Sequence, residues 1–569
     1  MAGSVAALLF LLFGANEGLR TRLKETPVLG PALTRVYRSI QTISEQNRRQ
    51  ELDYLYDNEP RALKITVRTR RPVLRFSPFW GGFGHDQFYA FAAEPRYRAF
   101  LELVRTANAG RPVFRWWRAH NIFSDFDTAW GVPSGGMVYR EDARGRPVYD
   151  FTRVDAVFDA ILAAGLTPIV ELGFMPRALA ADSTRTGDWG AAIVSPPRDY
   201  HAWSALVEAT VRHLVQRYGA EQVRTWYFEV WNEPDYVEQF WVPDPDAPER
   251  ADVAAYLELY QQTRAAVKKV DSALRVGGPA LAGWPYFLRA FTDGLKSDEI
   301  DFFSFHRYGD VHRDILPNLG SLIRDARGRQ KGRFAQVPYL LDETAPVAFT
   351  KESWKSTAHT AAWYARLVHG FLEVAAQQGS GFLPEAVVYW SDIGKNFSNG
   401  DGALASSIGK DEGFVVPGPV FQVNEMLAYM GDELLDIRGQ PEPGSPTGAF
   451  ATRKQNGDIA VLIFRQRDKN TVVDDSVQVS VQLTGLAGGT FDYSHFRIDN
   501  SNSLPWPLWN AWQRPDELTV VQKEALKARS TLARIDSGTA KPQNGAWRFQ
   551  VAMPANSVSL VLFRPKTKG

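Results

Sequence analysis

Eight short β-rich runs alternate with long helical patterns through the middle of the chain, and this alternation limits the possible folds more than any other feature. Between the runs lie amphipathic stretches such as Phe151–Ala164, where Val154, Val157, Phe158 and Ile161 recur at the spacing of one helix face. Eight strands separated by helices predict an α/β fold, a (β/α)8 or TIM barrel of parallel strands. The predicted strands are Leu74–Gly81, Phe114–Asn121, Thr167–Phe174, Thr225–Asn232, Ala273–Ala280, Ile300–Tyr308, Val337–Thr344 and Ala386–Ile393.

The chain divides into the barrel and three further segments. The predicted barrel occupies residues 74–439, and the Pro/Gly-rich stretch 440–448 marks its boundary. Residues 440–569 alternate short strands with turns, which predicts an accessory antiparallel β-sandwich domain. Residues 61–73 contain one more predicted strand, which we expect to join the sandwich, and residues 1–60 form an N-terminal segment.

The N-terminal segment contains an apolar run, Val5–Phe13, of the length found in the core of a signal peptide and too short to span a membrane. No Lys or Arg precedes it, and Gly14–Glu17 is a poor cleavage site. We expect export to the periplasm or the cell exterior, by a cleaved or weakly anchoring segment, rather than a cytoplasmic location. A helix packed on the fold and a misplaced start codon remain the alternatives.

The composition excludes several classes of protein. With 65 Lys+Arg against 64 Asp+Glu, the chain lacks the basic surplus of a nucleic-acid binder. The absence of cysteine excludes disulfides, thiolate metal sites and a cysteine nucleophile. No apolar run reaches the roughly 18 residues of a transmembrane helix. Because the sequence also has no HExxH motif and no calcium-loop spacing, we expect neither a metal nor a cofactor. The oligomeric state stays open.

Two carboxylates end predicted strands at the face where TIM barrels hold their active sites, the C-terminal ends of the strands. Glu233 ends the fourth strand within the sequence WNEP, and Glu343 ends the seventh within LLDET. Strands that far apart in the barrel face one another across its mouth. The two side chains are therefore expected to approach a common substrate, whereas glutamates that only pair with arginines would have no reason to occupy both strand ends.

Two opposed carboxylates are what glycoside hydrolysis requires, one protonated to release the leaving oxygen and one ionised to meet the oxocarbenium-like carbon. A separation of about 5 to 5.5 Å gives retention of configuration, and one of about 6.5 to 9.5 Å gives inversion. The residues alone leave both mechanisms open. Further side chains predicted near the strand ends, as contacts for sugar hydroxyls and ring faces, are Arg118, His120, Asn232, His306, Tyr308, Trp390, Asp392 and, in a glycine-rich loop, His85.

These motifs resemble those of glycoside hydrolase family 39, which contains β-xylosidases and α-L-iduronidases. The similarity rests on residues 226–235 (WYFEVWNEPD), on Glu343, and on the sequences His306-Arg307-Tyr308 and Arg118-Ala119-His120. It extends through residues 170–176 (VELGFMP), 389–392 (YWSD) and, in the predicted sandwich, 497–503 (RIDNSNS), so that it covers about residues 74–569.

The resemblance implies a retaining, two-step mechanism. Glu233 would match the acid/base of the family, Glu343 its nucleophile, and Asn232 the residue that hydrogen-bonds the 2-hydroxyl of the sugar. The two glutamates then need opposite environments. Glu233 needs a raised pKa beside apolar rings, and Glu343 needs donors such as Tyr308 and His306 that keep it ionised.

Two departures from the family bear on the substrate. Tyr308 stands where the iduronidases carry a Lys that suits a uronate carboxylate, which favours a neutral sugar. Residues 393–402 lack the acidic stretch of the β-xylosidases, so the outer binding surface is expected to differ. We expect a retaining exo-acting, β-xylosidase-like hydrolase of oligosaccharides or glycosides. The alternatives are a β-glucosidase, an arabinosidase, an α-L-iduronidase, an exopolysaccharide hydrolase or a carbohydrate-binding protein without catalysis.

Overall fold

The computed structural model describes residues 59–566, except for residues 130, 188–191, 241, 297, 349–352, 391–392, 396–401 and 469–474. The apolar run Val5–Phe13, on which the expectation of export depends, lies outside the described residues, and so does Asp392. No helix among the described residues is both long enough and apolar enough to cross a membrane. The described parts of Arg61–Asp244 and Glu249–Gly569 belong to one compact unit.

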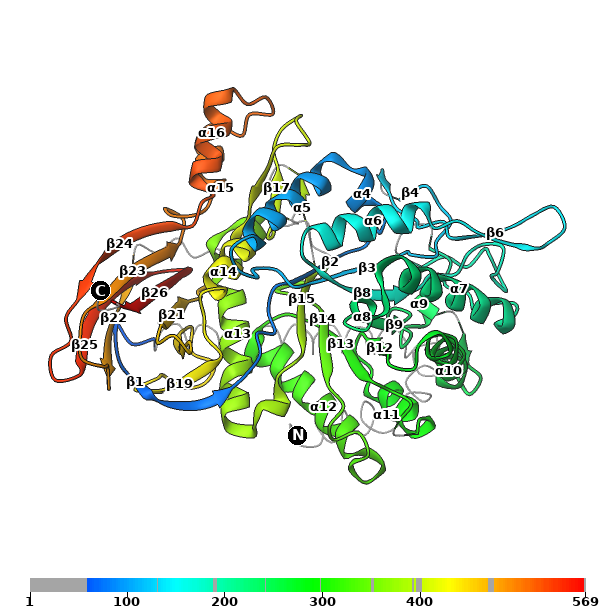
Figure 1. Cartoon of the computed structure of the whole chain (residues 1–569), viewed down its shortest axis with the longest axis horizontal. Coiled ribbons are helices and arrows are strands. Elements are labelled where there is room, and N and C mark those ends of the chain that lie inside the picture. Colours follow the sequence, from blue (N-terminus) through cyan, green and yellow to red (C-terminus); the bar gives the residue numbers. More distant parts are fainter. Residues whose placement is uncertain are drawn as a thin grey trace, which may run out of the picture. The chain divides into compact units, whose positions relative to one another are not determined.

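Eight parallel strands close into a barrel in the order β12-β13-β14-β15-β2-β3-β8-β9, which confirms the predicted TIM barrel (Figure 1). Seven of the eight strands fall within or overlap their predicted ranges; the first does not. The barrel strands are β2 (Gly82–His85), β3 (Trp116–Ala119), β8 (Thr167–Leu172), β9 (Tyr227–Val230), β12 (Arg275–Leu281), β13 (Phe302–Tyr308), β14 (Tyr339–Ala345) and β15 (Ala386–Trp390).

The first barrel strand lies at residues 82–85, directly after the range predicted for it. The bulky β-forming residues that favour a strand in the sequence are at 74–81, whereas the strand itself is rich in glycine. A Cβ atom added to Gly82 would lie 2.6 Å from the Val387 carbonyl oxygen, and one added to Gly84 would lie 2.2 Å from the Trp390 ring. Close packing against β15 therefore requires glycine here. A strand rich in glycine has no hydrophobic alternation, and its sequence looks like that of a loop.

Helices surround the barrel strands, as Figure 1 shows. In α6 the four residues whose spacing predicted the helix, Val154, Val157, Phe158 and Ile161, are all buried. Burying a side chain of this size contributes about 1.5 to 3 kcal/mol. The helices are α4 (Ala90–Ala93), α5 (Pro95–Asn108), α6 (Thr152–Ala163), α7 (Tyr200–Tyr218), α8 (Ala220–Val223), α9 (Val237–Phe240), α10 (Val253–Val270), α11 (Pro285–Gly294), α12 (Leu316–Gly332), α13 (Ala358–Gln378) and α14 (Pro419–Leu427).

The accessory domain is a nine-stranded sheet in the order β24-β23-β26-β21-β20-β19-β1-β22-β25. It is mixed rather than purely antiparallel, because β1 (Ala62–Arg75) pairs parallel with β22 (Ser476–Thr484). On its other edge β1 pairs antiparallel with β19 (Glu433–Arg438), which precedes the Pro/Gly-rich stretch. The other strands are β20 (Thr447–Arg453), β21 (Ile459–Arg465), β23 (Phe491–Ile498), β24 (Ala533–Ala540), β25 (Ala546–Pro554) and β26 (Ser557–Pro565).

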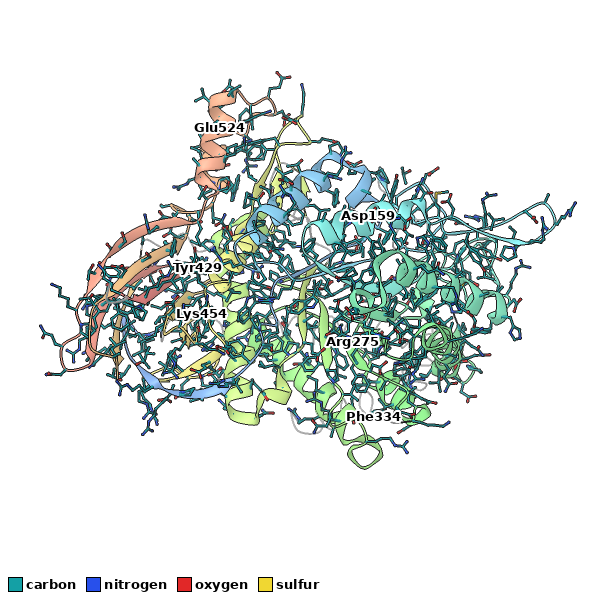
Figure 2. The ribbon with its side chains drawn as sticks, in the orientation of Figure 1. Asp159, Arg275, Phe334, Tyr429, Lys454 and Glu524 are labelled. Carbon is teal, nitrogen blue, oxygen red and sulfur yellow. The ribbon has the colours of Figure 1, made fainter. Side chains whose placement is uncertain are left out.

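Side chains from the barrel helices pack directly on this sheet. His369 of α13 lies with its ring centroid 5.2 Å from that of Phe464 and 6.2 Å from that of Phe450. Tyr429, labelled in Figure 2, follows α14 and stacks on Phe496 of β23 with 5.6 Å between centroids. The accessory domain therefore supports the outer face of the barrel.

A helical insertion of the accessory domain contacts the segment that follows β15. The insertion consists of α15 (Trp506–Ala511) and α16 (Val520–Arg529). The segment forms a small sheet of β16 (Ile393–Lys395), β17 (Ala405–Ser407) and β18 (Val415–Pro417). The two share a buried cluster of Ile408, Phe414, Val416, Trp509 and Leu526.

Candidate active site

Alternate residues of the barrel strands point into the barrel, and the inward positions change character along each strand. Tyr227 of β9 belongs to the apolar cluster of the interior, whereas its neighbour Phe228 packs between strands and helices. Two residues further on, the inward position is Glu229, and Arg118 of β3 and His306 of β13 are buried charged or polar residues as well. The C-terminal part of the barrel interior is therefore polar.

The Arg118 guanidinium is the centre of this polar group, and its side chain is 0% exposed. Its three nitrogens donate to carboxylate and amide oxygens within 2.8 Å, and Asp342 lies 3.5 Å away. The partners at 2.7 to 2.8 Å are Glu229, Glu343, Glu171 and Asn232. One positive charge faces four carboxyl groups, and such a buried cluster cannot hold all of them ionised.

The carboxyl groups around Arg118 differ in their affinity for protons. Burial raises the pKa of Glu171 to about 8 and raises that of Asp342 well above its ordinary value. The pKa of Glu229 is lowered, although burial opposes this, because Arg118 and the Asp342 side chain favour its ionised form. Glu229 is therefore ionised and, like Glu343, pairs with the positive charge of Arg118, whereas Asp342 is protonated and neutral.

Glu233 lies directly beyond β9 on a turn with unusual backbone geometry. Its φ angle is 45°, and its N–H donates to the Ala280 carbonyl at 3.2 Å. Pro234 follows, and the N–H of Tyr236 donates back to the Glu233 carbonyl at 3.1 Å. These contacts end the strand and direct the Glu233 side chain to the barrel mouth, where the residue is 7% exposed.

Glu343 reaches the same mouth through an irregularity in β14. Phe305 of β13 pairs with Leu341, but the next residue, His306, pairs with Glu343, so Asp342 is an extra residue in the strand. Such a bulge redirects side chains next to it. It lets the consecutive residues Asp342 and Glu343 both face Arg118. Glu343 also accepts a hydrogen bond at Oε2 from the Tyr308 hydroxyl, at 2.6 Å.

The two glutamates meet on either side of His306. The Nδ1 atom of His306 lies 2.8 Å from Glu233 Oε1 and 3.3 Å from Glu343 Oε2. One carboxylate oxygen of each glutamate and this nitrogen all lie within 4.8 Å of one another. Burial and the charge of Arg118 keep the pKa of His306 well below its ordinary value, so the ring is neutral.

The two carboxyl groups hold their protons unequally. Burial and the negative charge of Glu343 raise the pKa of Glu233 well above its ordinary value. Burial also raises the pKa of Glu343, to about 7, but Arg118 and the Tyr308 hydroxyl favour its ionised form and limit the rise. Glu343 therefore ionises first, and Glu233 keeps its proton while Glu343 is charged.

The same two glutamates and His306 present donor atoms close enough for a metal ion. Arg118 occupies the opposite side of Glu343 at 2.8 Å, so the carboxylate already faces a fixed positive charge. A second cation at the site would be repelled by the guanidinium. The different protonation states of the two glutamates account for the arrangement without a metal ion. The expectation that the protein binds no metal stays a prediction.

His120 and Trp390 complete the group. His120 Nδ1 lies 2.6 Å from Glu171 Oε2, and its Nε2 lies 3.5 Å from Glu343 Oε1. Burial lowers the pKa of His120 to about 4, so the ring is neutral and can bind hydroxyl groups. The Trp390 ring lies 4.7 Å from that of His120, and its Nε1 donates to Asp86 at 3.1 Å.

The amide of Asn232 is oriented by Arg118. Its Oδ1 accepts from the guanidinium at 2.8 Å, whereas its Nδ2 has no hydrogen-bond partner among the described residues. A buried amide nitrogen without a partner costs free energy unless a ligand accepts its hydrogens. Asn232 therefore presents a donor that a sugar hydroxyl can use.

One predicted residue is not brought into the group. His85 accepts at Nδ1 from the Gln87 N–H at 2.9 Å, and its Nε2 lies 2.6 Å from the Tyr97 hydroxyl. Its neighbour Asp86 contacts Trp390 instead. Glu229 is not among the residues predicted from sequence, although a charged residue inside the apolar run WYFEV indicates a polar contact within the barrel.

A TIM barrel whose mouth holds two opposed carboxyl groups, one ionising before the other, is a glycosidase scaffold. The model of glycosyl hydrolases family 39 matches residues 63–547, and the chain belongs to this family. It is thus a glycosidase of a family that hydrolyses its substrates with retention of configuration.

The relatives of the chain include enzymes of two specificities. A β-xylosidase of Geobacillus stearothermophilus is 27% identical over 505 residues, which cover 83% of this chain and 89% of that protein. An α-L-iduronidase of Canis lupus familiaris is 26% identical over 351 residues, 52% of this chain and 50% of that protein. The crystal structure of a monomeric β-xylosidase from Caulobacter crescentus covers 89% of this chain and 100% of its own, with 25% identity and a TM-score of 0.69.

Proposed function

We propose that the protein is an exo-acting, β-xylosidase-like hydrolase that releases a neutral sugar from oligosaccharides or glycosides, with Glu233 as acid/base and Glu343 as nucleophile. The observation that carries the proposal is the approach of the two glutamates, of which one carboxylate oxygen from each lies within 4.8 Å of the other. This spacing suits direct attack by one carboxylate, which needs about 5 to 5.5 Å, and leaves no room for the water of an inverting enzyme.

In the first step Glu343 attacks the anomeric carbon while Glu233 gives its proton to the leaving oxygen, and the glycosidic bond breaks. The product is a sugar joined covalently to Glu343. In the second step Glu233, now ionised, takes a proton from water, whose oxygen displaces Glu343. The amide nitrogen of Asn232 binds the 2-hydroxyl, which develops a stronger hydrogen bond in the transition state.

The contacts of Arg118 favour a neutral sugar over a uronic acid as the substrate. The Arg118 side chain is 0% exposed, and its donors are engaged by carboxylate and amide oxygens of the protein. Because each of its three nitrogens is engaged and the side chain is buried, Arg118 does not serve as a partner for the carboxylate of a uronic acid. The Tyr308 hydroxyl is likewise committed to Glu343. The names of the β-xylosidase relatives support a pentose as the sugar.

Hydrolysis of nitrophenyl β-xyloside, β-glucoside, α-arabinoside and α-iduronide tests the substrate. We expect the largest kcat/KM on the β-xyloside. We expect Glu343→Ala to lower kcat by about 10⁴-fold or more, because no group can replace the nucleophile. A Glu343→Ala variant that hydrolyses the best substrate as fast as the wild type would contradict the proposed mechanism. A preference for the iduronide would contradict the proposal that the substrate is a neutral sugar.

Azide distinguishes the two roles. In Glu233→Ala the intermediate on Glu343 can still form from an activated substrate, so azide should yield the β-glycosyl azide. In Glu343→Ala azide would take the place of the nucleophile and yield the α-glycosyl azide. Exchange of these two products would reverse the assignment of Glu233 and Glu343.

A further inference from the structure

Two large aromatic side chains beside Glu233 are exposed, although most aromatic residues of the barrel are buried. Tyr236 is 39% exposed and Trp284 is 41% exposed. Their rings meet edge to face, with centroids 6.4 Å apart. Two flat rings exposed side by side suit the apolar face of a sugar.

Tyr236 is positioned by the turn that carries Glu233. Its N–H donates to the Glu233 carbonyl at 3.1 Å, so the ring follows the carboxyl group by three residues on a turn fixed by Pro234. Burial, and after it the charge of Glu233, raises the pKa of Tyr236. Tyr236 therefore lies at the edge of the barrel mouth.

Trp284 comes from the loop after β12, and Asp235 joins that loop to the turn of Glu233. Asp235 Oδ1 accepts from the Ala282 N–H at 3.0 Å, and its Oδ2 accepts from the N–H groups of Gly283 and Trp284 at 2.9 and 3.0 Å. Asp235 is only 2% exposed. A buried carboxylate with three backbone donors holds both loops rigidly, so Trp284 keeps its position relative to Glu233.

The position of this aromatic pair indicates which half of a substrate it contacts. The Glu233 side chain is 9% exposed and that of Glu343 is 2% exposed, so Glu233 lies nearer to the solvent. In the mechanism proposed above, Glu233 protonates the leaving oxygen, and the leaving group must lie on its side of the cleaved bond. Among the described residues, Tyr236 and Trp284 are the exposed aromatic side chains that adjoin the turn of Glu233.

We propose that Tyr236 and Trp284 form the binding site for the leaving-group sugar, a neutral pyranose that stacks on these rings; this inference rests on the proposed function. A sugar fits better than a purely apolar group because polar groups accompany the rings. Arg307 lies beside the pair, with its Nη1 bonded to the carbonyls of Ala282 and His306. Its buried Nε has no hydrogen-bond partner among the described residues, so this polar group keeps one donor unused.

Two substrates with the same glycone separate leaving-group binding from the chemistry. One is the β-linked disaccharide of the preferred sugar, and the other is its β-glycosyl fluoride, whose leaving group has no ring to bind. We expect Trp284→Ala to lower the ratio of kcat/KM on the disaccharide to kcat/KM on the fluoride about tenfold. Trp284→Phe, which keeps a flat ring, should retain most of that ratio.

Ile535→Ala is the matched control, because Ile535 is 44% exposed and lies on β24 of the accessory domain. Its ratio should equal that of the wild type. An unchanged ratio in Trp284→Ala would overturn the inference. This holds both when the two kcat/KM values fall together, as a structural defect would cause, and when neither value changes. A wild type that hydrolyses neither substrate would overturn the proposed function and this inference with it.

Discussion

Arg118 donates a hydrogen bond from Nη1 to Glu343 Oε1 at 2.8 Å, between side chains that are 0% and 2% exposed. Because the same guanidinium also contacts Glu229 and Asn232, it fixes both the carboxylate and the amide on which the proposed chemistry depends. A buried ion pair of this kind gains little stability overall, but removal of one partner leaves the other charge without compensation. Arg118 is therefore expected to matter for both folding and catalysis.

Replacing Arg118 with Met should destabilise the fold by about 3 to 5 kcal/mol at pH 8, because buried carboxylates lose their counter-charge. The loss should be smaller at pH 5. Without Arg118 the carboxyl groups have raised pKa values in the folded state, and the cost of ionising them disappears as they take up protons. Urea unfolding at both pH values measures the difference.

Arg105→Met is the control for this experiment. Arg105 pairs with Glu102 on the surface of α5, with side chains 57% and 59% exposed. Exposed pairs contribute little to stability, so this variant should unfold like the wild type at both pH values. Equal losses for Arg118→Met at pH 5 and pH 8 would mean that lost packing, rather than charge, is responsible.

Tyr308→Phe should move the acidic limb of the kcat/KM profile to higher pH by about one unit. The Tyr308 hydroxyl donates to Glu343 Oε2 at 2.6 Å and favours the ionised form. Its removal raises the pKa of Glu343 further, so the proposed nucleophile is protonated over a wider range of acidic pH. Rates measured from pH 4 to 9 locate the limb.

Tyr339→Phe provides the comparison. Tyr339 lies on β14 with Glu343, is also buried, and donates to the Phe382 carbonyl at 2.6 Å. Its loss should lower the melting temperature without moving the acidic limb. If both variants move the limb equally, the hydroxyl of Tyr308 has no specific effect on Glu343.

The barrel and the opposed glutamates could be predicted from sequence because their signals are local. Helix spacing such as that of Val154 and Val157 and the strand-ending sequence around Glu233 and Pro234 each lie within a few residues. The parallel topology of a TIM barrel then brings the ends of distant strands to one mouth. The fold and the meeting of Glu233 with Glu343 follow from these two facts.

Features that depend on contacts between distant segments could not be predicted. The first barrel strand is glycine-rich because Gly84 packs against the Trp390 ring, a partner far along the chain. The bulge at Asp342 exists only in the pairing of β14 with β13. The parallel pairing of β1 with β22 likewise joins two segments that lie far apart along the chain. None of these has a local pattern of residues.

Replacing Glu343 with Gln should lower the pKa of Glu233. The negative charge of Glu343 is, after burial, the main reason that the pKa of Glu233 is raised, and glutamine removes the charge while keeping the shape. Carbon NMR of side-chain-labelled Glu233 in the wild type and in Glu343→Gln measures the two titrations. An unchanged pKa of Glu233 would show that burial alone sets its value and that the two carboxyl groups do not interact.

Replacing His369 with Phe should make the protein more resistant to acid. His369 packs between Phe450 and Phe464, and burial, with the charges of His312 and Arg366, lowers its pKa to about 3. Below the pKa of about 6.5 that a histidine has in the unfolded chain, His369 is protonated in the unfolded state but stays neutral in the folded state. The free energy of unfolding therefore falls as the pH decreases. Between pH 7 and pH 4.5 this histidine should cost about 2 kcal/mol, which His369→Phe would recover. Urea unfolding at the two pH values measures the cost, and an equal loss of stability in wild type and variant would mean that His369 is protonated in the folded state as readily as in the unfolded chain.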